Sequence, residues 1–248
     1  MNDQPKSIDV LNSEVKKIFH PFVNQYVKDF GEDLQAIYIY GEAADPEFSF
    51  KHGLVTAVLF LADTSPESLE KSLKTVARGQ RKGIAAPLCL TEEWARSSMD
   101  VFPLEFLEMK QSGVCVYGRD VLADLAPRTE HLRLFCEQQI KGKALRIQQA
   151  YLEVGRRRHG VESLLKDSLK ALIPVFRAIL FLRGKQFGYD REKILTDLCD
   201  EFSLSKETLL GIYEDAVHDD RIKGEDAFVV LSEYLRQLNI LADQVDRL

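Results

Sequence analysis

The chain has 248 residues, a mass of 28.3 kDa and a formal net charge of −6. Hydrophobic residues make up 45% and charged residues 29% of the sequence, which is typical of a globular protein with a sizeable core and argues against disorder. A sequence pI of about 5.5 argues against a protein built as a whole to hold a polyanion. The longest apolar run, residues 54–62, is too short to span a bilayer, so we expect no membrane segment.

The four cysteines and the first residues of the chain both favour a cytoplasmic protein. None of the cysteines forms a CxxC pair and all lie in apolar stretches, which is typical of buried, reduced thiols. The opening sequence MNDQPKSIDV has no basic segment followed by an apolar core, so we expect no signal peptide.

Helices and strands follow one another in the first half of the chain. Apolar residues at helical spacing predict a helix over residues 6–30, in which Pro21 is expected to cause a kink. Runs rich in Ile, Val, Tyr and Leu predict strands over residues 34–40 and 54–62.

The rest of this half continues the same pattern. A helix is predicted over residues 66–78, and a third strand over residues 84–90, which Pro87 would confine to the edge of a sheet. Thr91 is expected to cap a short helix with acidic residues in its first turn. Residues 114–117 predict a fourth strand.

Beyond Pro127 the sequence predicts helices alone. They are expected over residues 129–153, 161–183, 190–200, 205–217 and 225–247. Strands mixed with helices, followed by helices only, predict an α+β protein of two domains. We expect residues 1–126 to form a mixed sheet with helices and residues 127–248 to form an all-α helical bundle.

Residues 37–63 read IYIYGEAADPEFSFKHGLVTAVLFLAD, two apolar runs joined by a polar loop that begins at Gly41. The order helix, strand, Gly41 loop, long strand, helix, strand resembles the nucleotidyltransferase fold of kanamycin nucleotidyltransferase and polymerase-β-like enzymes. The resemblance covers residues 34–118, and a helical bundle often follows such a domain in that family. Residues 101–118 are similar to uncharacterised bacterial proteins of this fold, so we expect a bacterial protein.

The resemblance implies a two-metal phosphoryl transfer site, whose acidic residues this sequence lacks. In the family, an Asp-x-Asp pair opening the second strand and a third carboxylate on a later strand hold Mg²⁺, while a Gly-Ser turn contacts phosphate. Gly41 takes the Gly position, but Glu42 replaces the Ser and would repel a triphosphate. The Asp-x-Asp pair is expected at 53–55, where the sequence reads Gly-Leu-Val. No carboxylate occurs over 51–62 or 84–90.

Because Mg²⁺ needs anionic oxygen ligands, the leading hypothesis is a catalytically degenerate protein that acts as a binding or regulatory module rather than an enzyme. It is expected to use no cofactor and to bind a protein partner or a nucleotide, with nucleic acid as a less favoured ligand that stays open. In fused nucleotidyltransferases the first bundle helix often borders the nucleotide cleft. The resemblance therefore implies four ligand-binding candidates: Gly41, Glu42, Lys143 and Arg146.

Two alternatives stay open. An active, Mg²⁺-dependent and ATP-using nucleotidyltransferase would need relocated carboxylates, for which the candidates are Asp45, Glu47 and Asp63. Turn formation and solvated strand ends are the simpler interpretation of these three residues. The second alternative is a structural homodimer, in which apolar residues of the last helix pair across a two-fold axis: Leu235, Leu238, Leu241 and Val245.

Two further groups of charged residues can each be interpreted as a functional site or as ordinary surface residues. Glu105 and Glu108 lie three residues apart and could form an acid/base pair on one helical turn, but we favour acids that face water or pair with Lys110. The basic residues 156–158 could bind nucleic acid or phosphate. The simpler interpretation, which we favour, is that these residues stabilise the negative C-terminal end of a helix over residues 131–160, which is expected to end at Gly160.

Overall fold

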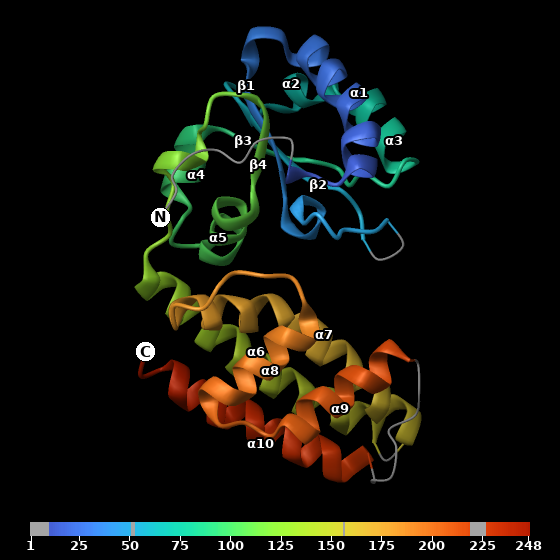
Figure 1. Cartoon of the computed structure of the whole chain (residues 1–248), viewed down its shortest axis with the longest axis vertical. Helices are drawn as coiled ribbons and strands as arrows, with labels where there is room; N and C mark the ends of the chain where they lie inside the picture. Colours follow the sequence, from blue (N-terminus) through green and yellow to red (C-terminus); the bar gives the residue numbers. More distant parts are fainter. Residues whose placement is uncertain (1–9, 51–52, 156, 219–226) are drawn as a thin grey trace. The chain divides into compact units, whose positions relative to one another are not determined.

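The computed structural model describes residues 10–50, 53–155, 157–218 and 227–248. The chain divides into two compact units, Met1–Arg128 and Thr129–Leu248 (Figure 1). The sequence had placed this division between residues 126 and 127. No helix in the described part of the chain is both long and apolar enough to cross a membrane.

A mixed sheet forms the centre of the first unit. Its strands are β1 (Leu34–Tyr40), β2 (Thr56–Leu61), β3 (Leu88–Leu90) and β4 (Val114–Gly118). Their order is β3-β2-β1-β4, with β1 antiparallel to both β2 and β4, and β3 parallel to β2. Tyr40 pairs with Thr56 and Leu34 with Leu61, so the Gly41 loop and Asp63 lie at opposite ends of β2.

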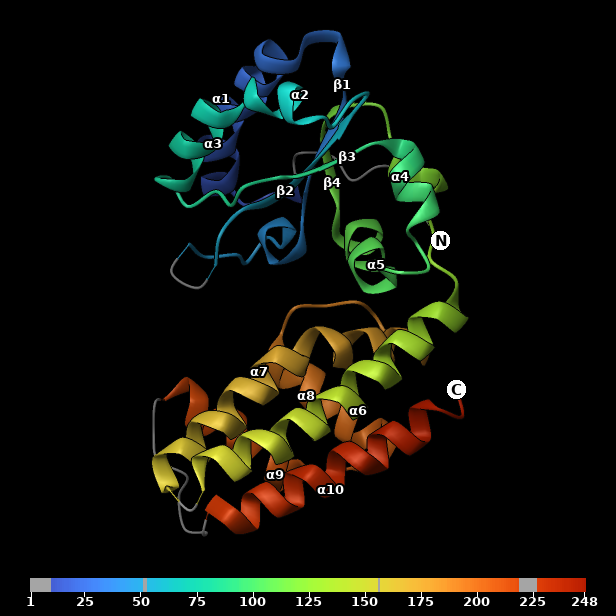
Figure 2. The same ribbon diagram turned by 180° about the vertical axis from the view of Figure 1, so that it is seen from behind.

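Helices cover both faces of this sheet (Figure 2). They are α1 (Ser13–Phe30), α2 (Pro66–Glu70), α3 (Leu73–Gln80), α4 (Glu92–Ser97) and α5 (Pro103–Ser112), with short 3-10 turns η2 (Gly31–Asp33), η3 (Gly41–Ala44) and η4 (Leu122–Asp124). Because side chains alternate along a strand, Ile37 and Ile39 point to the face packed by α1 and α3. Tyr38 and Phe60 point to the face packed by α4 and α5.

Some predicted elements are shorter than expected in the structure. Of the third strand predicted over residues 84–90, Ile84 forms only an isolated bridge, and regular pairing begins at Leu88, after Pro87. Proline has no N–H to donate, which explains both this late start and the edge position of β3. The helix predicted over residues 66–78 is two helices, α2 and α3.

The second unit is helical throughout its described residues. It contains α6 (Thr129–Val154), α7 (Arg158–Leu182), α8 (Arg191–Phe202), α9 (Lys206–Val217) and α10 (Ala227–Val245). These helices bury a core that includes Phe176 and Tyr234, both 0% exposed. The α+β fold class and the all-α second half are therefore confirmed.

The helix predicted to end at Gly160 ends earlier. α6 stops at Val154, and Gly155 has a φ of +62°, the left-handed conformation that commonly terminates a helix. Gly160 lies inside α7, so its expected role as the helix stop is wrong.

The basic tract beside this junction supports the end of α6. Arg157 donates from Nε to the Val154 carbonyl oxygen at 2.9 Å, which satisfies a carbonyl at the negative end of the helix dipole. Arg158 pairs with Glu162 at 3.0 Å, whereas Arg156 lies outside the described residues. The dipole interpretation of this tract therefore has direct support at Arg157.

The apolar residues proposed for a homodimer are used in the bundle core instead. Leu238, Leu241 and Val245 are 1%, 0% and 0% exposed, and Leu235 is half-buried. α10 packs on α6, α7 and α9. These three buried residues cannot also pair across a two-fold axis, so that part of the dimer hypothesis is wrong.

Candidate functional site

The candidate site begins where the chain leaves β1 through a sharp turn. Gly41 has a φ of +72°, a conformation that glycine adopts without steric strain. A Cβ atom at this position would lie 3.3 Å from Thr56 Oγ1. Ala43 and Ala44 are buried just after the turn. The glycine is therefore explained by local backbone geometry.

Two hydroxyl groups hold this turn. Thr56 Oγ1 donates to the Tyr40 carbonyl oxygen at 2.6 Å. Ser112 accepts a hydrogen bond from the Gly41 N–H at 2.9 Å and donates its own proton to the Glu108 carbonyl oxygen at 2.6 Å. The backbone amide that a phosphate-binding turn would offer is thus bonded within the protein.

We expect Ser112→Ala to lower the free energy of unfolding by about 1–3 kcal/mol, because it leaves the buried Gly41 N–H without an acceptor. Urea unfolding followed by circular dichroism measures this loss. Ser232→Ala is the matched control: Ser232 also donates to the carbonyl four residues earlier, at 2.9 Å, but on an exposed helix face. An equal loss in both variants would contradict the role of the Gly41 amide.

The first two relocated acids take part in turn formation. Asp45 Oδ1 accepts from the Glu47 N–H at 2.8 Å, and the Glu47 side chain is exposed. The Asn12 side chain donates to the Pro46 carbonyl oxygen at 3.1 Å and also caps α1, so it fastens the loop to that helix. Asp45 and Glu47 therefore show the turn chemistry that was the simpler interpretation.

The third relocated acid lies at the far end of the sheet. Asp63 accepts hydrogen bonds from the Ser65 N–H at 2.9 Å and the Ser65 hydroxyl at 2.5 Å, and the hydroxyl bond lowers the pKa of Asp63 most. At about 3.3 Å per residue, β2 puts roughly 20 Å between Asp63 and the Gly41 turn. Asp63 cannot join Asp45 at one metal ion. The described residues contain no cluster of three or more His, Cys, Asp or Glu side chains that could hold a metal.

The positions expected for the Asp-x-Asp pair are unsuited to acidic side chains. A Cβ atom on Gly53 would lie 3.2 Å from the Phe48 ring and 3.7 Å from Glu42 Oε2. Leu54 is 56% exposed and Val55 is fully buried. An aspartate at residue 53 would therefore require Phe48 to move and would bring its charge close to that of Glu42.

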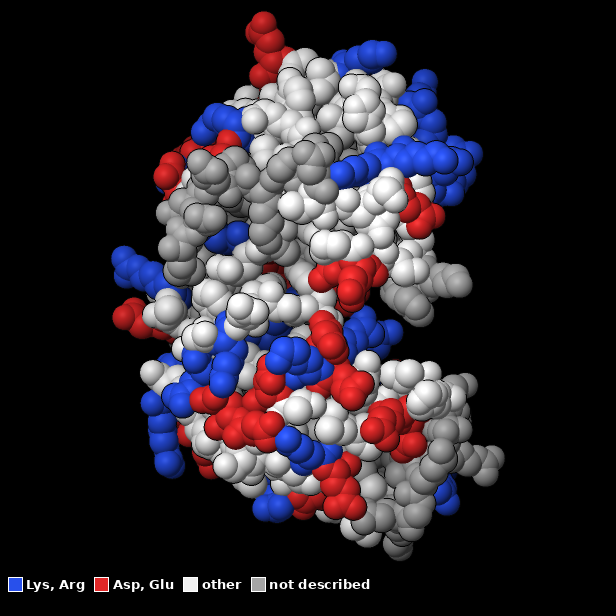
Figure 3. Space-filling view, in the orientation of Figure 1, with Lys and Arg blue, Asp and Glu red and all other residues white. Residues whose placement is uncertain are grey.

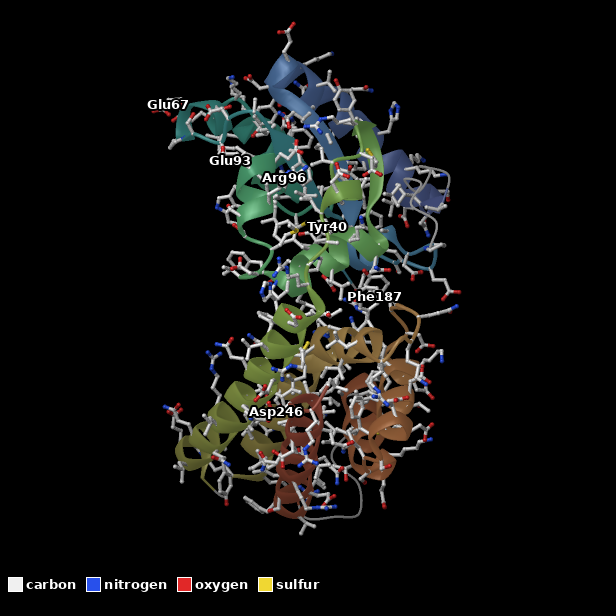
Figure 4. The ribbon with its side chains drawn as sticks, turned by 90° about the vertical axis from the view of Figure 1, so that its left-hand side faces the viewer. Tyr40, Glu67, Glu93, Arg96, Phe187 and Asp246 are labelled. Carbon is white, nitrogen blue, oxygen red and sulfur yellow. The ribbon has the colours of Figure 1, made fainter. Side chains whose placement is uncertain are left out.

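The sheet face that carries Tyr40 is covered by α5 (Figure 4), and Glu105 of that helix is close enough to act on the Tyr40 hydroxyl. Burial raises the pKa of the Tyr40 hydroxyl, and the Glu105 carboxylate raises it further. Glu105 Oε2 is buried and has no hydrogen-bond partner among the described residues. Lys110 donates instead to the Leu122 carbonyl oxygen at 3.0 Å. The expected pairing of Glu105 with Lys110 is therefore wrong, and the Glu105 side chain is half-buried, with one oxygen shielded from water.

The two basic candidates belong to the second unit. Lys143 and Arg146 both lie on α6, where Lys143 is half-buried and Arg146 is exposed. Their approach to the Gly41 turn stays a prediction. Sequence reasoning missed Ser112, because no motif links it to Gly41, 71 residues away.

Comparisons with known proteins support the fold but not an activity. No protein-family model matches the chain, and no curated protein matches it. Among solved structures, spectinomycin adenyltransferase AAD(9) from Enterococcus faecialis, determined with ATP and spectinomycin, is similar to this chain with a TM-score of 0.55 and 11% sequence identity. The match covers 89% of this chain and 99% of that one. The resemblance to the nucleotidyltransferase fold is confirmed.

Proposed function

We propose that this protein is a catalytically degenerate nucleotidyltransferase-like protein that acts as a binding or regulatory module. The observation that carries the proposal is the Gly41 turn. The Gly41 amide donates to Ser112, and the next residue is the acidic Glu42. The position expected for the first metal-binding aspartate is occupied by Gly53, where the Phe48 ring leaves little room for a side chain.

Electrostatics supports the same conclusion. At a triphosphate-binding site, Mg²⁺ is usually held by one or two protein carboxylates together with the phosphate oxygens. β2 offers none, because residues 53–61 contain no carboxylate. Without the metal, Glu42 would repel the triphosphate, by about 1–4 kcal/mol per pair of unit charges at 4 Å in surroundings between bulk water and a protein surface. Triphosphate chemistry at this turn is therefore disfavoured.

The active-enzyme alternative has weaker support. It needs carboxylates that converge on one metal, yet Asp45 is bonded to the Glu47 N–H and Asp63 lies at the other end of β2. No observation favours it over the binding module.

Titration calorimetry with ATP, with Mg²⁺ and with EDTA in its place, tests this proposal. We expect no Mg²⁺-dependent binding. Binding that is indifferent to Mg²⁺ would fit a nucleotide-binding module, and its absence would fit a module for protein partners.

Mg²⁺-dependent binding that Asp45→Asn weakens would overturn the proposal. Asp63→Asn is the matched control. It removes the same charge at the opposite end of β2, so it should leave any binding at the Gly41 turn unchanged.

A further inference from the structure

The first unit carries a concentration of positive charge away from the Gly41 turn (Figure 3). Residues 71–82 contain five basic residues and no acidic one: Lys71, Lys74, Arg78, Arg81 and Lys82. Residues 1–126 hold 13 Lys/Arg and 19 Asp/Glu, a net charge of −6, so the remainder of this half has a net charge of −11. The basic patch therefore belongs to a unit whose other residues are acidic on balance.

Four of these side chains form one stripe on α3 and its C-terminal end. Lys74 and Arg78 lie four residues apart on one face of α3, Arg81 caps its C-terminal end and Lys82 follows in the next turn; all four are exposed. We call them the α3 basic face. The stripe is about 12 Å long at 1.5 Å per residue.

The opposite side of α3 is fixed to α1. Thr75 donates to Asp29 Oδ2 at 2.5 Å, and a Cβ atom on Gly79 would contact the Phe22 ring at 3.4 Å. This contact holds the α3 basic face toward solvent. Nothing in the packing of α3 requires four cations there.

The cations of the α3 basic face are not neutralised within the described chain. Lys71 pairs with Asp33 at 3.1 Å, but none of the four stripe residues forms an ion pair with a described residue. Arg78 and Arg81 each donate from Nε to the carbonyl oxygen four residues earlier, at 3.3 and 3.2 Å. These bonds anchor each guanidinium at its Nε on the helix. Anchored forks of this kind suit bidentate contact with carboxylates.

The surroundings indicate the size and kind of ligand. Charges interact over about 8 Å at physiological ionic strength. A nucleic-acid duplex or an anionic membrane, each wider than the stripe, would extend over other parts of residues 1–126, which together have a net charge of −11. Single-stranded nucleic acid needs aromatic stacking surfaces, and α3, LKTVARGQ, has none. Leu73, next to the stripe, is 60% exposed and offers an apolar contact.

We propose that the α3 basic face binds a short acidic segment of a partner protein, with Leu73 contacting an apolar residue of that segment. This proposal specifies the kind of partner that the binding module would recognise. It rests on the proposed function only because it assumes that the module has a protein partner. It uses no residue of the Gly41 turn. The ATP titration and the experiment below can therefore fail independently.

Fluorescence anisotropy with a labelled oligoglutamate peptide tests the proposal. We expect saturable binding that added salt weakens, and that Arg78→Gln/Arg81→Gln weakens about tenfold or more by removing both guanidinium groups. The control is Lys206→Gln/Arg236→Gln, which removes two exposed positive charges from the second unit and should leave binding unchanged. A peptide with a central leucine should bind more tightly, and Leu73→Ser should remove only that gain.

Three results would overturn the proposal. Absence of peptide binding, or an equal loss in the control variant, would overturn the proposal. Tighter binding of a DNA duplex or of phosphatidylserine vesicles that depends on Arg78 and Arg81 would also overturn it, and would assign the surface to that ligand. Unchanged thermal unfolding of both double variants separates these results from misfolding.

Discussion

Gly118→Ala is expected to lower the free energy of unfolding by about 3–5 kcal/mol, through backbone strain together with overpacking. Gly118 has a φ of +83° at the end of β4, and an added Cβ atom would lie 2.0 Å from the Gln35 carbonyl oxygen. Because the obstacle is backbone of the neighbouring strand β1, β4 must move away from the sheet to make room. Urea unfolding followed by circular dichroism measures the loss.

Gly31→Ala is the matched control for this prediction. Gly31 also has a positive φ, +56°, but nothing lies within 4 Å of an added Cβ atom. Its substitution should cost only the strain of the left-handed conformation, about 1–2 kcal/mol. Equal losses in the two variants would show that the close approach of β4 to Gln35 contributes nothing.

Tyr38→Phe is expected to lower the free energy of unfolding by about 2–3 kcal/mol, because it leaves a buried N–H without its acceptor. The Tyr38 hydroxyl accepts from the Val121 N–H at 2.6 Å and donates to Asp120 Oδ1 at 2.8 Å, so it fixes the segment that follows β4. Chemical unfolding at neutral pH measures this loss. Asp120→Ala removes one acceptor of the hydroxyl and leaves the Arg119 carbonyl oxygen at 3.2 Å, so it should cost less than Tyr38→Phe.

The same hydroxyl gives a pH dependence. Burial raises the pKa of Tyr38 above its usual 10.0, so the folded protein holds this proton more tightly than the unfolded chain does. The resulting stability is present below pH 10 and is lost as the pH rises above it. Wild-type protein should therefore lose more stability than Tyr38→Phe between pH 9 and pH 11, a range that includes the usual pKa of tyrosine, about 10. Parallel losses would contradict this assignment.

The fold class and most of the helices and strands could be predicted from the sequence, because the spacing of apolar residues reflects which side chains are buried. A short run rich in Ile and Tyr predicted β1, and the loss of strand patterns after Pro127 predicted the helical second half. The absence of acids at residues 53–55 was also visible in the sequence. The resemblance that these features carried was confirmed by the structural similarity to a solved adenyltransferase.

The hydrogen-bond partners of the polar groups at the candidate site could not be predicted from the sequence, because they depend on tertiary contacts. Ser112 and Gly41 are 71 residues apart, and no local pattern encodes a hydrogen bond across that distance. Asp45 and Asp63 flank the same strand and are close in the sequence. The pairing of β1 with β2 nevertheless places them at opposite ends of β2. Likewise, the α3 basic face is directed to solvent because Thr75 and Gly79, on the other side of α3, pack against α1. Long-range contacts set these relationships because the same local sequence is compatible with several tertiary partners, and burial of the whole core selects one.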